Sequence, residues 1–313
     1  MFKWKKLGRV FNPADINNSW IKEFAQAPSV IIYENFIRVF FSCRPAPDSR
    51  DQFVSRLAFI DLKRDNLFEI INISKEPILS LGELGTFDEF GTYPASVIKN
   101  GNDIRAYYAG WTRCESVPFN AAIGLAYSHN NGATFERAGA GPVLSYSPDE
   151  PFVLGSPKIR KFNNTWYLWY SSGKKWLKSI PKPEPVYKIR MARSEDGINW
   201  IKYGKDLIEN ILEEDECQAS ADVFFYEGIY HMFFSYRFHL SKIYKIGYAS
   251  STNLLNWTRD DSKAGMETSA TGWDSEAVSY PYVFELDGKV YMFHQGNEIG
   301  RYGFGVAEME SYN

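Results

Sequence analysis

Apolar and polar residues alternate along most of the chain in short runs that are separated by turn residues. The segment "SADVFFYEGIYHMFFSYR", from Ser220 to Arg237, is a β-rich run, a Glu-Gly turn and a second alternating aromatic run. Such alternation on both sides of a short turn is typical of a β-hairpin. No long window shows the 3.6-residue periodicity of an amphipathic helix. The pattern therefore predicts an all-β protein.

The hairpin pattern recurs five times, and a weaker strand-turn-strand pattern follows it. The five hairpins are anchored at Pro28, Pro94, Pro157, Ala221 and Pro281, which are spaced by 66, 63, 64 and 60 residues. Each period thus holds about four strands, which is the repeat of a β-propeller. We predict a single domain over residues 1–313, a five-bladed β-propeller with four-stranded antiparallel blades. The N-terminal "WKKLGRVFNP" is expected to supply the last outer strand and close the ring.

Acidic residues precede the predicted inner strands at a repeated position. Five residues before the anchors the chain has Glu23, Glu89, Phe152, Glu216 and Glu276, flanked by other acids. The inner strands of a propeller converge on a central channel, so these acids are expected to meet in one pocket. Converging carboxylates shift one another's pKa values. The alternative is that they cap backbone amides at the tops of the blades.

Two carboxylates across a pocket are the minimum requirement for glycoside hydrolysis, in which one donates a proton and the other acts as base or nucleophile. The catalytic candidates are Asp88, Glu89, Glu216, Asp274 and Glu276. Substrate-binding candidates lie near the same channel mouth or at the ends of the second hairpin strands, where Arg and Asn suit hydroxyls or anions and Trp offers a stacking surface. They are Glu23, Arg44, Tyr93, Trp111, Arg113, Trp176, Arg237, His294 and Asn297.

Other polar motifs are interpreted as structural. The turn "SHNNGATF", from Ser128 to Phe135, is similar to the Asp-box of sialidases, and "SEDGINW", from Ser194 to Trp200, is a shorter version. Ser, Asn and Gly satisfy the backbone of such turns. His231 and His239 lie within or just beyond a predicted strand and are expected to be structural.

Charge and composition limit the kinds of partner, location and cofactor that are expected for this protein. The net charge is −3 and no basic cluster exceeds "KWKK", so a nucleic-acid partner is not expected. No apolar run reaches the length of a membrane span, and no signal peptide is recognisable, so a cytoplasmic location is predicted. Three widely spaced cysteines, Cys43, Cys114 and Cys217, indicate neither disulfides nor a zinc site. Carboxylates and carbonyls in a channel would suit a calcium ion, but no loop has a calcium-binding motif, so no cofactor or metal is predicted.

The five repeats resemble the five-bladed propeller glycoside hydrolases of families 43 and 32 and the family-130 mannoside phosphorylases. The stretches "GTFDEFGTYPASV" and "GWDSEAVSYPYVF" are similar to propeller proteins found with surface-polysaccharide synthesis. The family-43 pattern places an Asp directly before the first anchor, and an Asp and a Glu two residues before later anchors. The corresponding residues here are Ala27, Thr92, Gly155, Ala219 and Ser279. The family-43 triad is therefore absent.

The resemblance implies a carbohydrate-active enzyme that acts on a glycosidic linkage of an oligosaccharide or an activated sugar. Within this interpretation, hydrolysis competes with phosphorolysis and with glycosyl transfer in polysaccharide synthesis. A phosphorylase needs cations for phosphate, and Arg44, Arg113 and Arg237 are candidates. Two other interpretations are a sugar-binding propeller without catalysis and a scaffold for protein interactions.

Overall fold

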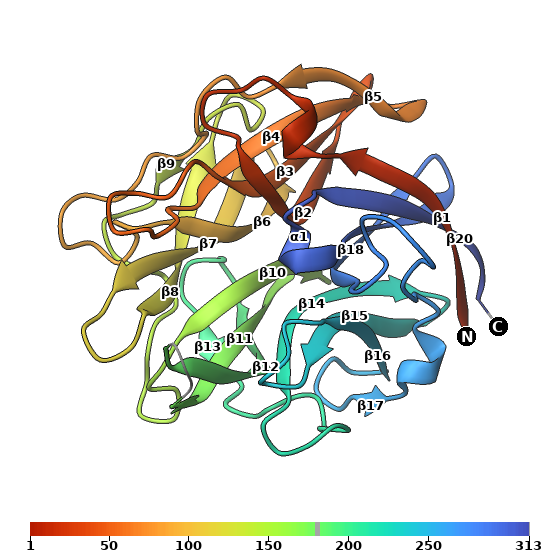
Figure 1. The fold of residues 1–313 in the computed structure, drawn as a ribbon. Coiled ribbons are helices and arrows are strands. Elements are labelled where there is room, and N and C mark those ends of the chain that lie inside the picture. Colours follow the sequence, from red (N-terminus) through yellow and green to blue (C-terminus); the bar gives the residue numbers. More distant parts are fainter. Residues whose placement is uncertain (179–181, 313) are drawn as a thin grey trace.

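The computed structural model describes residues 1–178 and 182–312, and in it five four-stranded antiparallel sheets surround a central channel as the blades of a propeller (Figure 1). The predicted fold is confirmed. In blades 1 to 4 the first strand in sequence is innermost, and the other strands follow it outward in sequence order as a meander. This order results from tight turns between consecutive strands, as the Asn-Gly, Glu-Gly and Asp-Gly pairs predict.

The bounds of the elements follow the five repeats. Blade 1 consists of β2 (Glu23–Ile32), β3 (Phe36–Arg44), β4 (Arg56–Lys63) and β5 (Asn66–Ile73). Blade 2 consists of β6 (Thr92–Asn100), β7 (Asp103–Arg113), β8 (Phe119–Ser128) and β9 (Glu136–Arg137). Blade 3 consists of β10 (Leu154–Phe162), β11 (Thr165–Leu177), β12 (Glu184–Ser194) and β13 (Ile201–Lys202). Blade 4 consists of β14 (Cys217–Tyr226), β15 (Ile229–Arg237), β16 (Lys245–Ser251) and β17 (Thr258–Arg259). Blade 5 consists of β18 (Ser279–Leu286), β19 (Lys289–Gln295), β20 (Phe304–Tyr312) and β1 (Phe2–Phe11). Short helical turns are η1 (Pro13–Asp15), η2 (Asp261–Lys263) and α1 (Asn297–Gly300).

Blade 5 joins the two ends of the described chain. Strand β1 pairs antiparallel with β20, from Phe2 opposite Tyr312 to Phe11 opposite Phe304. The indole N–H of Trp4 donates to the carbonyl of Ala264 at 3.0 Å and holds β1 against blade 4. The expected N-terminal closing strand is therefore confirmed.

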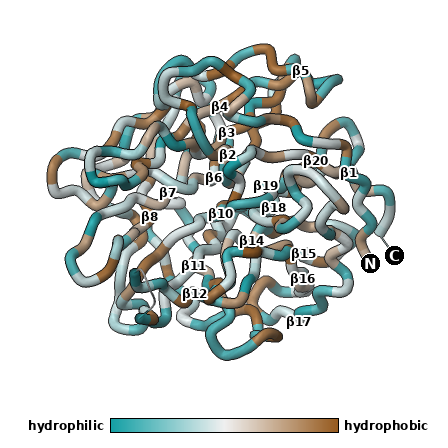
Figure 2. The backbone as a smooth tube through the Cα atoms, in the orientation of Figure 1, coloured by the Kyte–Doolittle hydropathy of each residue, from teal (hydrophilic) through white to brown (hydrophobic). Residues whose placement is uncertain are grey.

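The core lies between neighbouring blades, because each strand turns alternate residues toward the next sheet. Between blades 5 and 1, for example, Phe41, Phe293 and Phe304 pack together, with Phe293–Phe304 ring centroids 5.4 Å apart. Figure 2 shows many hydrophilic segments in the outer loops. The large aromatic content of the chain is thus used mainly to fill these interfaces.

The inner strands are bulged where they reach the channel mouth. Each has an irregular register just before its anchor residue. In four blades the residue directly before the anchor has a positive φ, close to +50° in each, and these residues are Ala27, Ser156, Ser220 and Tyr280. Non-glycine residues adopt this region at a cost and concentrate at functional sites. The repeated bulge therefore indicates a functional site at the channel mouth.

The two Asp-box-like turns connect strands, as expected. The Ser128 hydroxyl accepts a hydrogen bond from the Gly132 N–H at 2.9 Å, and Ser194 accepts one from Gly197 at the same distance. His231 is buried and contacts the Tyr248 hydroxyl at 2.7 Å. Among the described residues, no helix has the length and apolar character needed to cross a membrane.

Candidate functional site

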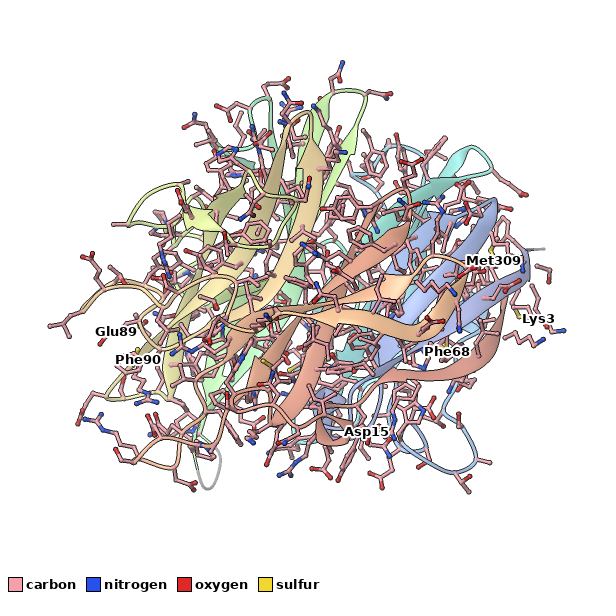
Figure 3. The ribbon with its side chains drawn as sticks, turned by 90° about the horizontal axis from the view of Figure 1, so that it is seen from above. Lys3, Asp15, Phe68, Glu89, Phe90 and Met309 are labelled. Carbon is pink, nitrogen blue, oxygen red and sulfur yellow. The ribbon has the colours of Figure 1, made fainter. Side chains whose placement is uncertain are left out.

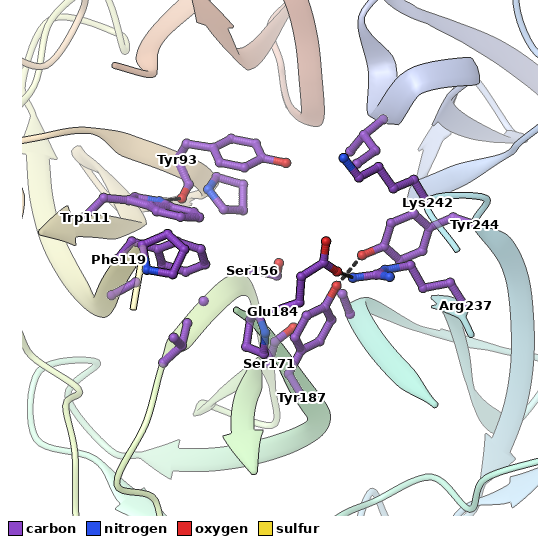
Figure 4. Close-up of a pocket in the computed structure, with 18 of the residues that line it drawn as sticks. Tyr93, Trp111, Phe119, Ser156, Ser171, Glu184, Tyr187, Arg237, Lys242 and Tyr244 are labelled. Atoms are coloured by element: carbon purple, nitrogen blue, oxygen red, sulfur yellow. Dashed lines mark hydrogen bonds and ion pairs between the residues drawn. The ribbon is translucent and has the colours of Figure 1, made fainter. Parts of the chain in front are cut away.

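A cavity of about 340 Å³ lies at the channel mouth, lined by residues from all five repeats (Figure 4). The bulged inner strands supply Tyr93, Ser156 and Tyr280, the residues directly before three anchors. Gly155 and Ala219, two residues before their anchors, also line it. These last two are positions at which the family-43 pattern expects acids. At these two positions the lining of the cavity is therefore small and uncharged.

The charged lining of the cavity is dominated by cations. Among the described residues, Glu184 is the only carboxylate that lines it, whereas the cations are Arg44, Lys182, Arg237 and Lys242. The Glu184 Oε2 atom lies 3.4 Å from Arg237 Nη2. This balance favours an anionic ligand, because opposite charges attract more strongly in a partly desolvated cavity than in water.

The cavity has two unlike walls (Figure 4). Tyr93, Trp111 and Phe119 lie on one side, whereas Arg237 and Lys242 lie on the other, and Glu184 lies between them. The Tyr93 and Trp111 rings are stacked with centroids 6.1 Å apart. An aromatic wall suits the apolar face of a sugar ring, and a cationic wall suits a phosphate or a carboxylate.

Arg237 is held in place by the backbone of the loop that follows β15. Its Nη1 donates to the carbonyls of Phe238 at 3.2 Å and of His239 and Ser241 at 2.5 Å each. Its guanidinium also lies 5.4 Å from the centre of the Tyr244 ring. Because these contacts fix the side chain before a ligand arrives, little conformational entropy is lost on binding.

Buried phenols complete the cavity. Tyr187 and Tyr244 share a hydrogen bond between their hydroxyls. Burial raises the pKa of Tyr93 to about 12 and raises the pKa values of Tyr187 and Tyr280 well above their ordinary range. These phenols consequently stay protonated at neutral pH and add hydrogen-bond donors without adding negative charge.

The five predicted catalytic carboxylates do not line this cavity, and the structure does not bring them together. Three of them are buried and bound to a cation on the outermost strand of their own blade. Asp88 lies 2.7 Å from Arg137, Glu216 lies 2.6 Å from Arg259, and Asp274 lies 2.6 Å from Lys6. Glu150 makes the same kind of contact with Lys202 at 2.6 Å. In blades 2 to 5 an acid therefore clasps the loop before the inner strand to the outer edge of the blade.

Hydrogen bonds from the second strand of the blade complete three of these clasps. The Tyr108 hydroxyl donates to Asp88 at 2.8 Å, the Tyr170 hydroxyl donates to Glu150 at 2.9 Å, and His294 contacts Asp274 at 3.4 Å. Glu216 instead accepts from the backbone N–H groups of Ile211 and Leu212 at 3.0 Å each. The expected convergence was wrong because these acids are bound within their own blades.

The remaining two catalytic candidates lie outside the cavity. Glu89 accepts a hydrogen bond from the Gly85 N–H at 2.9 Å, and Figure 3 places it near the edge of the molecule. Glu276 is exposed, and its backbone N–H donates to the Asn297 side chain at 2.8 Å. Neither carboxylate faces a second one across the channel mouth.

Four predicted substrate-binding residues do meet in the cavity, namely Arg44, Tyr93, Trp111 and Arg237. Arg113 lines a smaller adjoining cavity. The others line neither: Glu23 binds Arg301 at 2.9 Å, Trp176 packs on Phe119, His294 binds Asp274, and Asn297 caps the loop before β18. The register of the hairpin ends was thus a better guide to the site than the acids.

Sequence reasoning missed Glu184, as well as Lys182 and Lys242. Strands β11 and β12, the second and third strands of blade 3, form the longest such pair among the described blades, and Leu177 pairs with Glu184 at its far end. This extension brings Glu184 to the cavity. The sequence signal that could have identified Glu184 is "PKPEPVY", in which this Glu stands between prolines at the start of a strand. Within residues 1–178 and 182–312, no three His, Cys, Asp or Glu side chains group as metal ligands.

The chain is similar to solved propeller structures of carbohydrate-active enzymes. It matches a thermostable family-43 glycoside hydrolase at a TM-score of 0.64 and 16% identity, covering 92% of this chain and 88% of that chain. It matches the family-32 β-fructofuranosidase of Bombyx mori at a TM-score of 0.64 and 18% identity, covering 95% of this chain and 64% of that chain. It matches the β-1,2-mannobiose phosphorylase of Listeria innocua at a TM-score of 0.71 and 11% identity, covering 98% of this chain and 96% of that chain. At these low sequence identities, the structural similarity shows a shared fold and nothing beyond it.

Two curated relatives are similar in sequence, whereas no protein-family model matches the chain. The β-1,2-mannobiose phosphorylase of Thermoanaerobacter sp. (strain X514) is 27% identical over 145 residues, which cover 43% of this chain and 45% of the relative. An uncharacterised protein of Mycobacterium tuberculosis, found in strains H37Rv and CDC 1551, is 32% identical over 309 residues, 98% of this chain and 99% of the relative. The chain therefore belongs to the family of this uncharacterised mycobacterial protein.

Proposed function

We propose that the channel-mouth cavity catalyses phosphate-dependent glycosyl transfer, in which a sugar passes between phosphate and the hydroxyl of an acceptor sugar. Phosphorolysis of a glycoside is the same reaction run in reverse. The observation that carries the proposal is the single carboxylate, Glu184, among several cations in one cavity. Hydrolysis by the usual route needs a second carboxylate to act on water or on the sugar, and the described lining offers none.

In the synthetic direction, the Glu184 carboxylate takes the proton from the acceptor hydroxyl. The acceptor oxygen then forms a bond to the anomeric carbon as the bond from that carbon to the phosphate oxygen breaks. Arg237 and Lys242 bind the departing phosphate, which takes up the proton that Glu184 has received, so that hydrogen phosphate leaves and the carboxylate is restored. Cations at the leaving group stabilise the charge that develops there.

The contact between Glu184 and Arg237 supports this assignment of roles. The contact holds the proposed base beside a proposed phosphate ligand, with Glu184 Oε2 3.4 Å from Arg237 Nη2. In the reverse direction hydrogen phosphate supplies both the attacking oxygen and, through Glu184, the proton for the leaving hydroxyl. The partial sequence similarity to a mannobiose phosphorylase is in line with this chemistry. A phosphorylated sugar donor would also suit the cytoplasmic location and the role in surface-polysaccharide synthesis expected from the sequence.

The test is turnover with and without phosphate. The protein is incubated with a panel of sugar 1-phosphates and acceptor sugars, and the release of inorganic phosphate is measured. The reverse assay supplies disaccharides with phosphate and measures sugar 1-phosphate. Activity in both directions, lost in Glu184→Gln, is the expected result. Cleavage of glycosides at equal rates without phosphate would indicate a hydrolase, and binding without turnover in any assay would indicate a sugar-binding propeller.

A further inference from the structure

A second cavity, of about 260 Å³, adjoins the first. The residues that line both cavities form the boundary between them, and they are Arg44, Tyr93, Trp111, Pro118, Phe119 and Lys182. The Trp111 and Phe119 rings are in contact, with centroids 4.2 Å apart. A ligand that extends beyond the aromatic wall of the first cavity would therefore enter the second one.

Arg44, at this boundary, is a cation that forms no ion pair with a described carboxylate, and Glu23 acts on it only at longer range. Its Nε atom is buried and has no hydrogen-bond partner, and no hydrogen bond or ion pair to its guanidinium occurs within the described ranges 1–178 and 182–312. The guanidinium lies instead 4.1 Å from the centre of the Phe24 ring and 5.2 Å from that of Phe53. The nearby Glu23 carboxylate is bound to Arg301 at 2.9 Å.

A guanidinium in this position is costly unless an anion joins it. Burial lowers the pKa of Arg44, which reflects the desolvation of its charge. The second arginine of the same cavity, Arg113, differs because it is paired with Asp48 and lies 4.3 Å from the centre of the Phe90 ring. Of the two arginines, Arg113 thus has a direct ion pair and Arg44 has none with a described residue, and a ligand anion at Arg44 would form charge-assisted hydrogen bonds there.

The other lining of the second cavity suits a sugar ring. Phe53 and Phe90 provide aromatic faces, and Asp51, Gln52 and Thr112 provide groups that hydrogen-bond hydroxyls. The first cavity has its cationic wall on the opposite side, at Arg237 and Lys242 (Figure 4). If phosphate binds that wall, the aromatic side is left for the acceptor.

We propose that the second cavity binds an acidic sugar ring of the acceptor, with Arg44 binding the anionic group of that ring. The anion is a carboxylate, as in a uronic acid, or a phosphate ester. The assignment to the acceptor rests on the proposed function, whereas the recognition of an acidic sugar by Arg44 does not.

The test is direct binding to the full chain, measured by calorimetry in phosphate-free buffer. The ligands are D-glucose, D-glucuronate and D-glucose 6-phosphate. At least one of the two acidic sugars is expected to bind roughly tenfold more tightly than glucose, as a charge-assisted bond requires. The Arg44→Gln variant should lose this preference, and Arg44→Lys should retain part of it. Arg64→Gln is the matched control, because Arg64 lies outside both cavities, in an exposed pair with Asp287. Loss of the glucuronate preference assigns the carboxylate, and loss of the glucose 6-phosphate preference assigns the phosphate ester.

Equal binding of all three sugars, or an acidic preference that survives in a folded Arg44→Gln variant, would overturn the proposal. Thermal melting shows whether each variant is folded. The outcome is independent of catalysis: a protein that binds acidic sugars through Arg44 but shows no phosphate-dependent turnover keeps this inference and refutes the proposed function. A protein that shows phosphate-dependent turnover but no binding of acidic sugars through Arg44 keeps the proposed function and refutes this inference.

Discussion

The Lys6 ammonium lies 2.6 Å from the Asp274 carboxylate, although the two residues are 268 positions apart in the chain. Lys6 belongs to β1, and Asp274 precedes the innermost strand of the same blade, so the pair spans blade 5 from its edge to the channel. The Asp274 side chain is 3% exposed and that of Lys6 is 23% exposed. The pair therefore helps to hold the N-terminal strand in the ring.

Asp274→Asn should destabilise the protein by about 3 kcal/mol, because it leaves Lys6 and His294 without their shared anion. The shift of the urea midpoint measures this loss. Lys289→Met is the control, since the Lys289–Glu308 pair is exposed and its removal should cost less than about 1 kcal/mol. An equal shift in both variants would mean that the clasp has no special role in closure.

Acid should weaken the same region in two stages. Burial alone would raise the pKa of Asp274, but His294, Lys6 and Ser269 outweigh it and hold that pKa well below its ordinary value. The stability from Asp274 is thus complete above about pH 4, the pKa in the unfolded chain, and is lost as the pH falls further. Burial lowers the pKa of His294, so its contribution declines below about pH 6.5. Urea midpoints from pH 3 to 7 should show both slopes, and Asp274→Asn should lack the lower one.

Glu184→Gln should reduce turnover by about 10²–10⁴-fold without a comparable loss of stability, since it removes the proposed base from a solvent-accessible site. Glu216→Gln is expected to do the opposite. It removes the buried partner of Arg259, so the urea midpoint falls while turnover per folded molecule is kept. Loss of turnover in a folded Glu216→Gln variant, with normal turnover in Glu184→Gln, would reverse the two assignments.

Lys242→Met should raise the KM for phosphate by roughly tenfold and change kcat little, because it removes one charge-assisted contact from the cationic wall. Lys245→Met tests for a general effect of net charge, since this exposed residue of β16 does not line the cavity. Phosphate saturation curves for the two variants provide the comparison. Identical curves would place the phosphate elsewhere.

The propeller was predictable because its signals are local. A hairpin such as Ser220–Arg237 shows its strands and turn within one short segment, and repetition supplies the blades. The acids were misplaced for the opposite reason. Glu89, Glu216 and Glu276 are equivalent when counted from their anchors, but the loops before β6, β14 and β18 follow different paths. Equal spacing in the sequence therefore did not give equal positions in space.

Glu184 could not be found by counting within the repeat, because it lies on an extension that is longer in blade 3 than in the other blades. Its position depends on how far β11 and β12 continue past the regular hairpin, from Gly173 opposite Tyr187 to Leu177 opposite Glu184. By contrast, Arg44 and Arg237 end regular second strands and Trp111 lies two residues before the end of another, and this shared place at the hairpin exits was visible in the sequence. Site residues on shared elements were predictable, and those on a blade-specific element were not.

The pairing of β1 with β20 also has a consequence for biosynthesis. Tyr312 leaves the ribosome some 300 residues after its partner Phe2, roughly 15–60 s later at ordinary rates of translation. During that interval β1 has an apolar face and no sheet to join. The nascent chain is therefore expected to benefit from chaperones that shield β1 until β20 emerges.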